Sequence, residues 1–513
     1  MDCVHVRLED ESDPEILRSA LRIVVSENEA LIAKLQKALA EIAALKNLDG
    51  SEVAGQILLL RAQLEAAQKK QYEASTEQTP GARPKAEPKV KLKQTGHGPN
   101  PQPQLERIET PQLLVASDAL CTTCGGELAS WDGQEEVSEE VSVIERKLVV
   151  LVHRREKKRC ACGGCIQVAP APPKLREGGR YSADFAIEVA TSKYLDHLPL
   201  ERQCRIMARE GLSVTSQSLW DQVESLATWL QPAWVRLGAH QLTAPLLHVD
   251  ETHWRLASKS GASRWWAWVS LSADGAYFEL KDSRSAEAGS PLLAGYTGLV
   301  MSDGYAAYES MRKTALRERG CSFAHAHCWS HVRRKFIELE TTFPNESKAA
   351  VERINALFML EREFPERMQD DATLLQRARM RTEKSAPLVA ELGEWLHTLR
   401  ALPKSALGKA VQYTVNLWAG LTLFLTNSRI PLSNNAAERV VRGPVVGRKN
   451  YYGARSERGC QVAAILYSLL ESAKLCGLEP KSYLRTAIQD ALAGRLVRLP
   501  HELKTTPRAA ELP

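Results

Sequence analysis

The chain has 513 residues, of which 44% are hydrophobic and 25% charged, a composition that excludes fibrous and disorder-dominated proteins and allows three or four globular domains. The net charge of +5 is small for this length, so a nucleic-acid partner has to be inferred from local basic clusters. The sequence has no apolar run of about 18 residues, so we expect no membrane-spanning helix. The N-terminus has no signal pattern either, and we expect a cytoplasmic protein.

Apolar residues recur every seven positions from residue 15 to residue 48. Leu17, Leu31 and Leu45 fall at d positions and Asn28 at an a position, a pattern typical of parallel dimers because a buried amide is best satisfied by its own copy. The spacing predicts a coiled coil or leucine zipper over residues 14–72 and a homo-oligomer that dimerises through it. The alternative is one amphipathic helix packed on its own domain.

A Pro- and Lys-rich linker over residues 73–104 leads to a cluster of cysteines. Five of the eleven Cys lie close together, and in a cytosolic chain this indicates metal binding. We predict a zinc-ribbon-like domain over residues 105–172, with strands between the two knuckles and a structural Zn²⁺ ion. Its ligands would be Cys121 and Cys124 with Cys162 and Cys165, and Cys160 is an alternative ligand. Packing of the cysteines without metal is the other reading.

Residues 173–242 have helical patterning with the cadence of a helix-turn-helix. Gly211 would lie in the turn, and Ser213, Thr215 or Ser216 would cap the second helix. We expect this region to bind DNA, although the same shape is a common packing unit. The side chains expected to face a DNA groove are Gln217, Ser218, Asp221 and Gln222.

Two apolar runs after residue 243 each end in an aspartate. Residues 244–250 predict a buried strand that ends at Asp250, and residues 298–303 predict another that ends at Asp303. Glu251 follows Asp250 directly and should therefore point to the opposite face of its strand. Between Asp250 and Asp303, residues 263–272 and 276–284 predict two strands joined by a turn at Asp274 and Gly275, so we expect residues 243–340 to form the first part of an α/β core.

A third acid, Glu438, falls in the first turns of a helix that Ser433 or Asn434 would cap. This helix opens the last part of the core, residues 431–490, after a predicted helical insertion over residues 341–430; residues 491–513 form a C-terminal tail, loosely ordered beyond about Leu499. A lone Asp at a strand end is more often a turn residue. Three acids on separate elements instead favour Mg²⁺ or Mn²⁺, and two such ions can assist phosphoryl transfer.

Basic residues next to these acids suggest contacts with DNA phosphates. They are Arg333, Arg334 and Lys335 on one helix and Arg439, Arg442, Arg448 and Lys449 on another.

Several long motifs carry a family resemblance: HVDETHW, SDGYAAY, CWSHVRRKF and NNAAERVVRGPVVGRKN. They resemble the large transposase of the insertion-sequence-sixty-six family over residues 96–490. The resemblance implies a DDE transposase with an RNase H-like catalytic core, in which Asp250, Asp303 and Glu438 match the acidic triad. Ser433 departs from the family, which usually has Asp there.

The resemblance also implies partners and accessory features. The partners would be the terminal inverted repeats of the element, target DNA and small accessory proteins of the same element, in a bacterial cytoplasm and near the nucleoid. Cys328 and His331, which with His325 and His327 suggest a second metal site, have a spacing that resembles a short motif of many DDE transposases.

Two other functions remain open from the sequence. One is a tyrosine nuclease that uses the triplet His325, Ala326 and His327 with Tyr451 or Tyr452 as the nucleophile. The other is a catalytically inactive DNA-binding regulator.

Overall fold

The computed structural model describes residues 124, 147–159, 166–258, 261–364 and 370–503. By its contacts the chain divides after residue 143 into two units, and the second, residues 144–513, contains all the helices and strands that the structure describes. The predicted coiled coil and the Pro- and Lys-rich linker lie outside the described residues. So do four of the five clustered cysteines, Cys121, Cys160, Cys162 and Cys165.

The described part of the predicted zinc ribbon is a short antiparallel pair of strands. These strands are β1 (Lys157–Arg159) and β2 (Ile166–Val168), in which Lys157 pairs with Val168. Residues 147–156 have no regular secondary structure, so of the strands expected between the two knuckles the described residues contain only β1. The apolar side chains of Val149, Val150, Leu151 and Val152 are 63–88% exposed, and a strand with no packed face loses its main source of stability.

The core is a five-stranded sheet in the order β5-β4-β3-β6-β7. β3 (Leu246–Ser258), β4 (Gly261–Leu271) and β5 (Ala276–Lys281) are antiparallel, whereas β6 (Leu299–Ser302) and β7 (Ala324–His327) run parallel to β3. The predicted turn at Asp274 and Gly275 joins β4 to β5, and Ser272 N–H donates to the Gly275 carbonyl at 2.8 Å. The alternating pattern of apolar residues therefore predicted this hairpin correctly.

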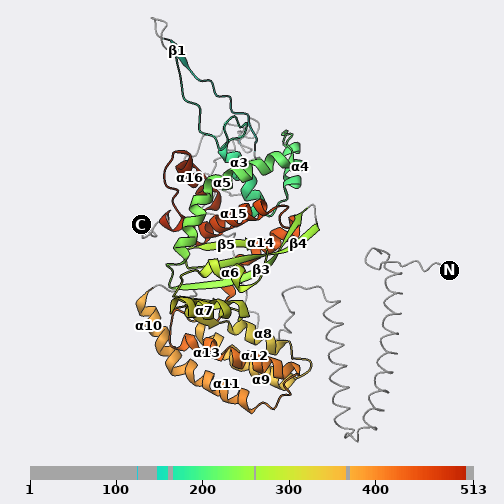
Figure 1. Cartoon of the computed structure of the whole chain (residues 1–513), viewed down its shortest axis with the longest axis vertical. Coiled ribbons are helices and arrows are strands. Elements are labelled where there is room, and N and C mark those ends of the chain that lie inside the picture. The colour runs from blue at the N-terminus through green and yellow to red at the C-terminus, as the bar shows by residue number, and fades with distance from the viewer. Residues whose placement is uncertain (1–123, 125–146, 160–165, 259–260, 365–369, 504–513) are drawn as a thin grey trace, which may run out of the picture. The chain divides into compact units, whose positions relative to one another are not determined.

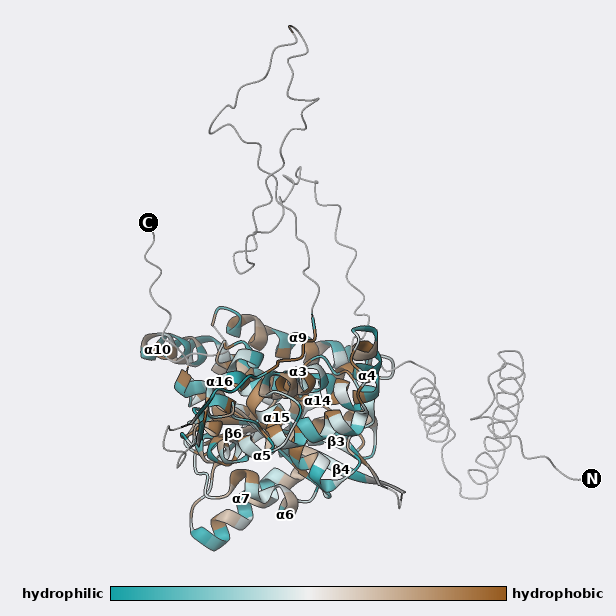
Figure 2. Ribbon diagram, turned by 90° about the horizontal axis from the view of Figure 1, so that it is seen from above, coloured by the Kyte–Doolittle hydropathy of each residue, from teal (hydrophilic) through white to brown (hydrophobic). Residues whose placement is uncertain are grey.

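Each face of the sheet has its own hydrophobic core, because successive side chains of a strand point to opposite faces. Leu247 and Val249 of β3 pack with Tyr308 of α7 (Ala306–Arg319). Trp254 and Leu256 of β3 belong to the core on the other face, with α5 (Ser216–Gln241) and α15 (Glu457–Leu475). Figure 1 shows these helices on opposite sides of the strands, and Figure 2 shows α15 inside the helical layer.

Four helices, from the beginning and the end of the described unit, form one hydrophobic core with α15. They are α3 (Ala183–Tyr194), α4 (Leu200–Arg209), α5 and α16 (Pro480–Leu492). Beyond α16, Val497 and Leu499 are buried and Pro500–Leu503 forms a 3-10 turn, η4. The tail was expected to be loosely ordered from about Leu499. That prediction was wrong for residues 499–503, because their apolar side chains complete the core.

A second helical group lies between β7 and α14 (Asn435–Tyr451). A buried ion cluster anchors it: Glu361 accepts hydrogen bonds from Arg377 and from Arg381, whose guanidinium also donates to the Ile430 carbonyl at 2.8 Å. The members of this group are α8 (Trp329–Ile337), α9 (Pro344–Glu361), α10 (Asp371–Met380), a π-helical turn η2 (Arg381–Ser385), α11 (Ala386–Thr398), α12 (Ala406–Asn416), α13 (Trp418–Thr422) and η3 (Leu423–Leu425).

The link from β5 to β6 is short and helical, with α6 (Ala286–Gly289) followed by η1 (Ser290–Leu293). Among the helices of the described ranges, none combines the length and apolar character needed to cross a lipid bilayer.

Candidate active site

Asp250 lies within β3, on the face opposite Glu251. The prediction that the strand ends at Asp250 was wrong, because pairing with β4 extends β3 to Ser258. Asp250 Oδ1 accepts a hydrogen bond from the Glu251 backbone N–H at 2.8 Å. Burial raises the pKa of the Asp250 carboxyl well above its usual value, and the charges of nearby acids raise it further. Those acids are Glu251, Asp303 and Glu438. The residues predicted as a triad are therefore close enough for their charges to interact.

Asp303 directly follows β6, which is parallel to β3 and pairs Met301 with His248. Its Oδ1 accepts from the Tyr305 backbone N–H at 2.8 Å, and its carbonyl accepts from the Tyr413 hydroxyl at 2.5 Å. Gly304 has φ +90°, and a Cβ there would lie 2.6 Å from Leu417 Cδ1. Glycine is thus required for the turn that holds Asp303 at the end of β6.

Glu438 occupies the first turn of α14, as predicted, but the start of this helix differs from the prediction. Asn434 is at the N-cap position without a side-chain capping bond. Its Nδ2 instead donates to the Val249 carbonyl at 2.9 Å, and its backbone N–H donates to Cys328 Sγ at 3.1 Å. Ser433 is not the cap residue. Asn434 is thus at the cap position, as one of the two predicted alternatives, but a side-chain capping bond is absent because the buried Asn434 amide attaches α14 to the sheet.

The Glu438 carboxylate faces α8. His331 Nδ1 lies 3.8 Å from Glu438 Oε1, and Arg334 Nη2 lies 4.0 Å from Oε2. Oε1 is buried and has no hydrogen-bond partner among the described residues. Burial lowers the pKa of His331, while the nearby charges of Asp303 and Glu438 act in the opposite direction. Cys328 and His331 thus both contact the start of α14.

These acids have the composition of a hard-cation site. Carboxylate oxygens suit Mg²⁺ or Mn²⁺, and a cation would relieve the repulsion among buried like charges. The carboxylate oxygens of the three acids do not all lie within 4.8 Å of one another. Within the described ranges, the group of three possible metal ligands that meets this distance is made of other residues. The unpartnered Oε1 of Glu438 is consistent with a ligand still to be added.

A fourth acid beside the triad has its own partners. Glu251 Oε1 accepts from Arg284 Nη2 at 2.6 Å, and Oε2 accepts from the Tyr308 hydroxyl at 2.6 Å. The Arg284 guanidinium lies 3.9 Å from the centre of the Tyr305 ring. Sequence reasoning placed Glu251 on the opposite face but missed Arg284 and Tyr308, which no local motif connects to it.

The predicted phosphate-binding residues fall into two groups. Arg448 Nη1 donates to Thr252 Oγ1 at 2.9 Å and also to the His253 carbonyl, and Arg333 Nε donates to Asn355 Oδ1 at 2.7 Å. Both guanidinium groups are therefore committed to internal contacts. The exposed residues of the set are Arg334, Lys335, Arg439, Arg442 and Lys449.

The helix-turn-helix prediction agrees locally with α4 and α5. Gly211 lies between them with φ +88°, and Thr215 Oγ1 accepts from the Ser218 N–H at 3.1 Å. Of the residues expected to face a groove, Gln217 is exposed, whereas Ser218, Asp221 and Gln222 are half-buried. The exposed cations of this pair are instead on α4: Arg202, Arg205 and Arg209.

The parts of the alternative tyrosine site are separated. His325 and His327 are on β7, where His325 Nε2 pairs with Ser302 Oγ at 2.8 Å. The Tyr451 hydroxyl contacts that of Tyr467 in the core around α15, and burial raises its pKa. A buried phenol is a poor nucleophile towards DNA. Tyr452 is exposed at the end of α14.

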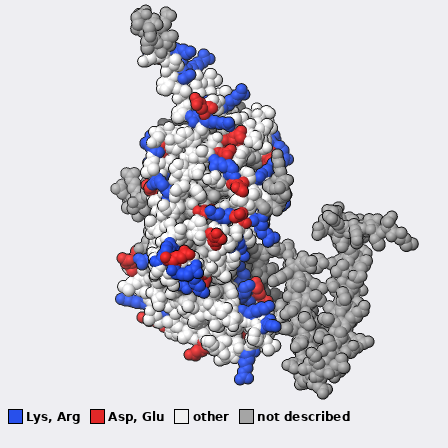
Figure 3. Space-filling view, in the orientation of Figure 1, with Lys and Arg blue, Asp and Glu red and all other residues white. Residues whose placement is uncertain are grey.

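Charge on the visible face of the described unit is mixed. Figure 3 shows Lys and Arg side chains interspersed with Asp and Glu over this face. Local groups of cations, and not a uniformly basic surface, are therefore the candidates for DNA contact.

Comparison with known proteins identifies the class to which this fold and acid site belong. Residues 178–462, which include all three acids, match the family model described as "Transposase IS66 family". Residues 118–163 match the model described as "zinc-finger binding domain of transposase IS66". The chain belongs to the IS66 family of transposases. The second match supports a structural zinc ion; it includes Cys160 and Cys162, whereas Cys165 lies beyond its end.

Similar proteins come from Sinorhizobium fredii (strain NBRC 101917 / NGR234). Uncharacterized protein y4hP is 30% identical over 75% of this chain and 72% of the relative. Uncharacterized protein y4qI is 31% identical over 79% of this chain and 75% of the relative. Their names record no activity, so the chemistry has to be argued from the residues of this chain.

Proposed function

We propose that this transposase is a DDE enzyme that cleaves DNA at the ends of an insertion sequence and joins the freed 3′ ends to target DNA. The supporting observation is that Asp250, Asp303 and Glu438 come from β3, the end of β6 and α14, and that the pKa of Asp250 is raised by burial first and then by nearby charges, which include Glu251, Asp303 and Glu438. Such a set of acids is needed to hold two divalent cations.

The three carboxylates would each have a defined role. Asp250 and Asp303 would hold Mg²⁺ or Mn²⁺, and Glu438 would complete the second position. The cations would activate the attacking oxygen and stabilise the leaving oxygen of each phosphoryl transfer. The residues of this chain position the acids: Tyr305 and Tyr413 hold Asp303, and Asn434 joins the helix of Glu438 to the strand of Asp250.

We also infer that the catalytic core is RNase H-like. Three antiparallel strands, followed by two strands parallel to the first, support this assignment. The helical group between β7 and α14 would then be an insertion between the second and third acids, as predicted for residues 341–430. Its role would be to shape a DNA channel or the assembly.

The remaining partners belong to the same proposal. DNA phosphates would contact Arg334, Lys335, Arg439, Arg442 and Lys449, and the terminal repeats would be bound with help from residues 173–242. Dimerisation through residues 14–72 and small accessory proteins remain predictions. The zinc ligands would be Cys121, Cys124 and Cys162, with Cys165 or Cys160 as the fourth.

The test is cleavage and strand transfer on a duplex that contains an element end, in the presence of Mg²⁺. Asp250→Asn, Asp303→Asn and Glu438→Gln should each abolish both reactions, because each removes charge that a cation needs. DNA affinity should change little, since phosphate binding depends on Arg and Lys. Normal cleavage by Glu438→Gln would remove this residue from the triad.

The same assay separates the alternatives. A DNA 5′ end covalently joined to the protein would favour a tyrosine nuclease. DNA binding without any cleavage by the wild-type protein would favour an inactive regulator.

A further inference from the structure

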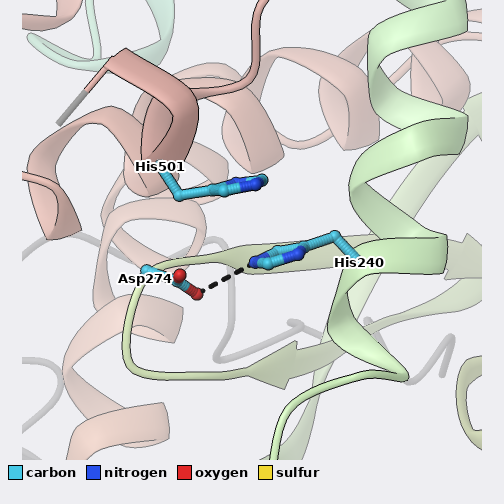
Figure 4. Close-up of side chains that lie close together, drawn as sticks. All are labelled: His240, Asp274 and His501. Carbon is cyan, nitrogen blue, oxygen red and sulfur yellow. Dashed lines mark hydrogen bonds and ion pairs between the residues drawn. The ribbon is translucent and has the colours of Figure 1, made fainter.

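Two histidines and an aspartate from distant parts of the chain meet outside the proposed acid site. His240 is on the last turn of α5, Asp274 is in the β4–β5 turn, and His501 is in the 3-10 turn η4. Figure 4 shows the two imidazole rings stacked one above the other, with the Asp274 carboxylate directed towards the His240 ring. One donor atom from each residue lies within 4.8 Å of the other two.

We propose that His240, Asp274 and His501 form a second zinc site, which binds Zn²⁺ through two imidazole nitrogens and one carboxylate oxygen and ties the C-terminal turn to the sheet. Two nitrogens and one oxygen suit Zn²⁺ better than Mg²⁺, because imidazole is a borderline ligand and Mg²⁺ prefers oxygen. This site is independent of the zinc finger and of the proposed DDE chemistry.

The donor spacing supports this assignment. Zinc bonds to nitrogen and oxygen of about 2.0 to 2.2 Å place two ligands of a tetrahedral ion roughly 3.3 to 3.6 Å apart. His240 Nε2 and Asp274 Oδ1 are 3.2 Å apart, which is close to this separation. The rings of His240 and His501 have centroids 3.7 Å apart and planes within 7° of parallel. One ring has to tilt for both lone pairs to point at one ion.

Contacts around the three residues already hold them in place. Ser272 Oγ donates to Asp274 Oδ1 at 2.9 Å, and Cys476 Sγ donates to the Asp274 carbonyl at 3.2 Å. Arg236 donates to the Val497 carbonyl at 2.6 Å and to Glu502 Oε1 at 2.7 Å, which fixes the turn on both sides of His501. Such supporting hydrogen bonds orient metal ligands before the ion arrives.

The exposure of the cluster also suits a metal. His501 Nδ1 is buried and has no hydrogen-bond partner in the described part of the chain. The side chains of His240 and Asp274 are 24% and 31% exposed, so an ion can reach them.

The test is the zinc content of the full-length protein after equilibration with Zn²⁺ and removal of free metal. Wild type should hold one equivalent per chain more than Asp274→Asn and His240→Gln, because each variant lacks one ligand of the site. His397→Gln, which replaces an exposed histidine elsewhere, should match wild type. Equal zinc content in wild type and both cluster variants would overturn the proposal.

A second measurement does not depend on counting ions. Trypsin can cut after Arg495 and Arg498, just before η4. Zn²⁺ should slow these cuts about tenfold in wild type. The ion can bind all three ligands only when η4 is packed on the core, so it lowers the fraction of molecules in which this segment is detached and open to trypsin. Asp274→Asn, which retains the side-chain size, should show no such protection at equal circular dichroism. Equal protection by Zn²⁺ in both proteins would also overturn the proposal.

Discussion

The side-chain amide of Asn434 donates a hydrogen bond to the Val249 carbonyl at 2.9 Å, across 185 positions of sequence. Val249 directly precedes Asp250, and Asn434 directly precedes the helix that bears Glu438. One buried amide therefore sets the distance between the first and third proposed acids. Its Oδ1 also pairs with His248 Nδ1 at 3.0 Å.

Asn434→Ala should reduce DNA cleavage at least tenfold and destabilise the protein by about 1 to 3 kcal/mol, because it leaves the Val249 carbonyl buried without its donor. Cleavage assays and denaturant unfolding measure the two effects. Asn435→Ala, at the exposed neighbouring position, is the matched control and should change neither. A fully active Asn434→Ala protein would show that α14 is placed by other contacts.

Glu251→Gln should retain cleavage within about tenfold of wild type, in contrast to Asp250→Asn, because its carboxylate points to the other face and binds Arg284 and Tyr308. We expect it to lower the free energy of unfolding by about 1 to 2 kcal/mol through weaker charged hydrogen bonds. If Glu251→Gln abolishes cleavage while remaining folded, Glu251 belongs to the reacting site and its assignment here is wrong.

Arg448 and Lys449 are adjacent in sequence and should behave differently. Arg448→Ala should lower the unfolding midpoint by an amount equivalent to about 1 to 3 kcal/mol, because the Thr252 hydroxyl and His253 carbonyl lose their donor. Lys449→Ala should leave stability unchanged but reduce the slope of log affinity against log salt by about 1, as expected for one lost phosphate contact. If Lys449→Ala lowered stability and Arg448→Ala changed only the salt dependence, Lys449 would be the structural residue and Arg448 the phosphate contact.

Acid sensitivity should arise in part from His325. Burial lowers the pKa of His325 to about 4 from its ordinary value of 6.5. The unfolded chain therefore takes up the proton first, and stability present near neutral pH is lost as the pH falls from about 6.5 towards 4. Between pH 7 and pH 5 the free energy of unfolding should fall by about 2 kcal/mol because of His325.

Denaturant unfolding of His325→Gln at both pH values tests this expectation. The variant should lose less stability on acidification than wild type. Some loss of stability on acidification should remain in the variant, because burial also lowers the pKa of His327, to about 3. His397→Gln should behave as wild type, and an unchanged pH dependence in His325→Gln would contradict the assignment.

Glu361 should be essential for the helical group between β7 and α14. Its carboxylate is the shared acceptor for Arg377 and Arg381, and the Arg381 side chain is 0% exposed. Glu361→Ala should cost about 3 to 5 kcal/mol, because it leaves buried cations unpaired. Thermal unfolding measures this loss. Glu363→Ala, two residues away, is the control, and equal midpoints in the two variants would show that the cluster contributes little.

Local patterns in the sequence were sufficient for much of the fold. Alternating apolar residues predicted β4, β5 and their turn, and apolar runs predicted the strands that present Asp250 and Asp303, although β3 continues beyond Asp250 to Ser258. Side-chain period along a strand also placed Glu251 opposite Asp250. These inferences succeed because each depends on the geometry of a few consecutive residues.

Only the tertiary structure decided which polar groups meet. Asn434 attaches to Val249 instead of capping its helix, Arg448 is committed to internal acceptors, and residues 499–503 pack against the body. The pairing of His240 and Asp274 with His501 joins three segments that no motif connects. A side chain's partner depends on which distant segments the cores bring together, and burial then makes that partner obligatory because an unpaired polar group in the interior is costly.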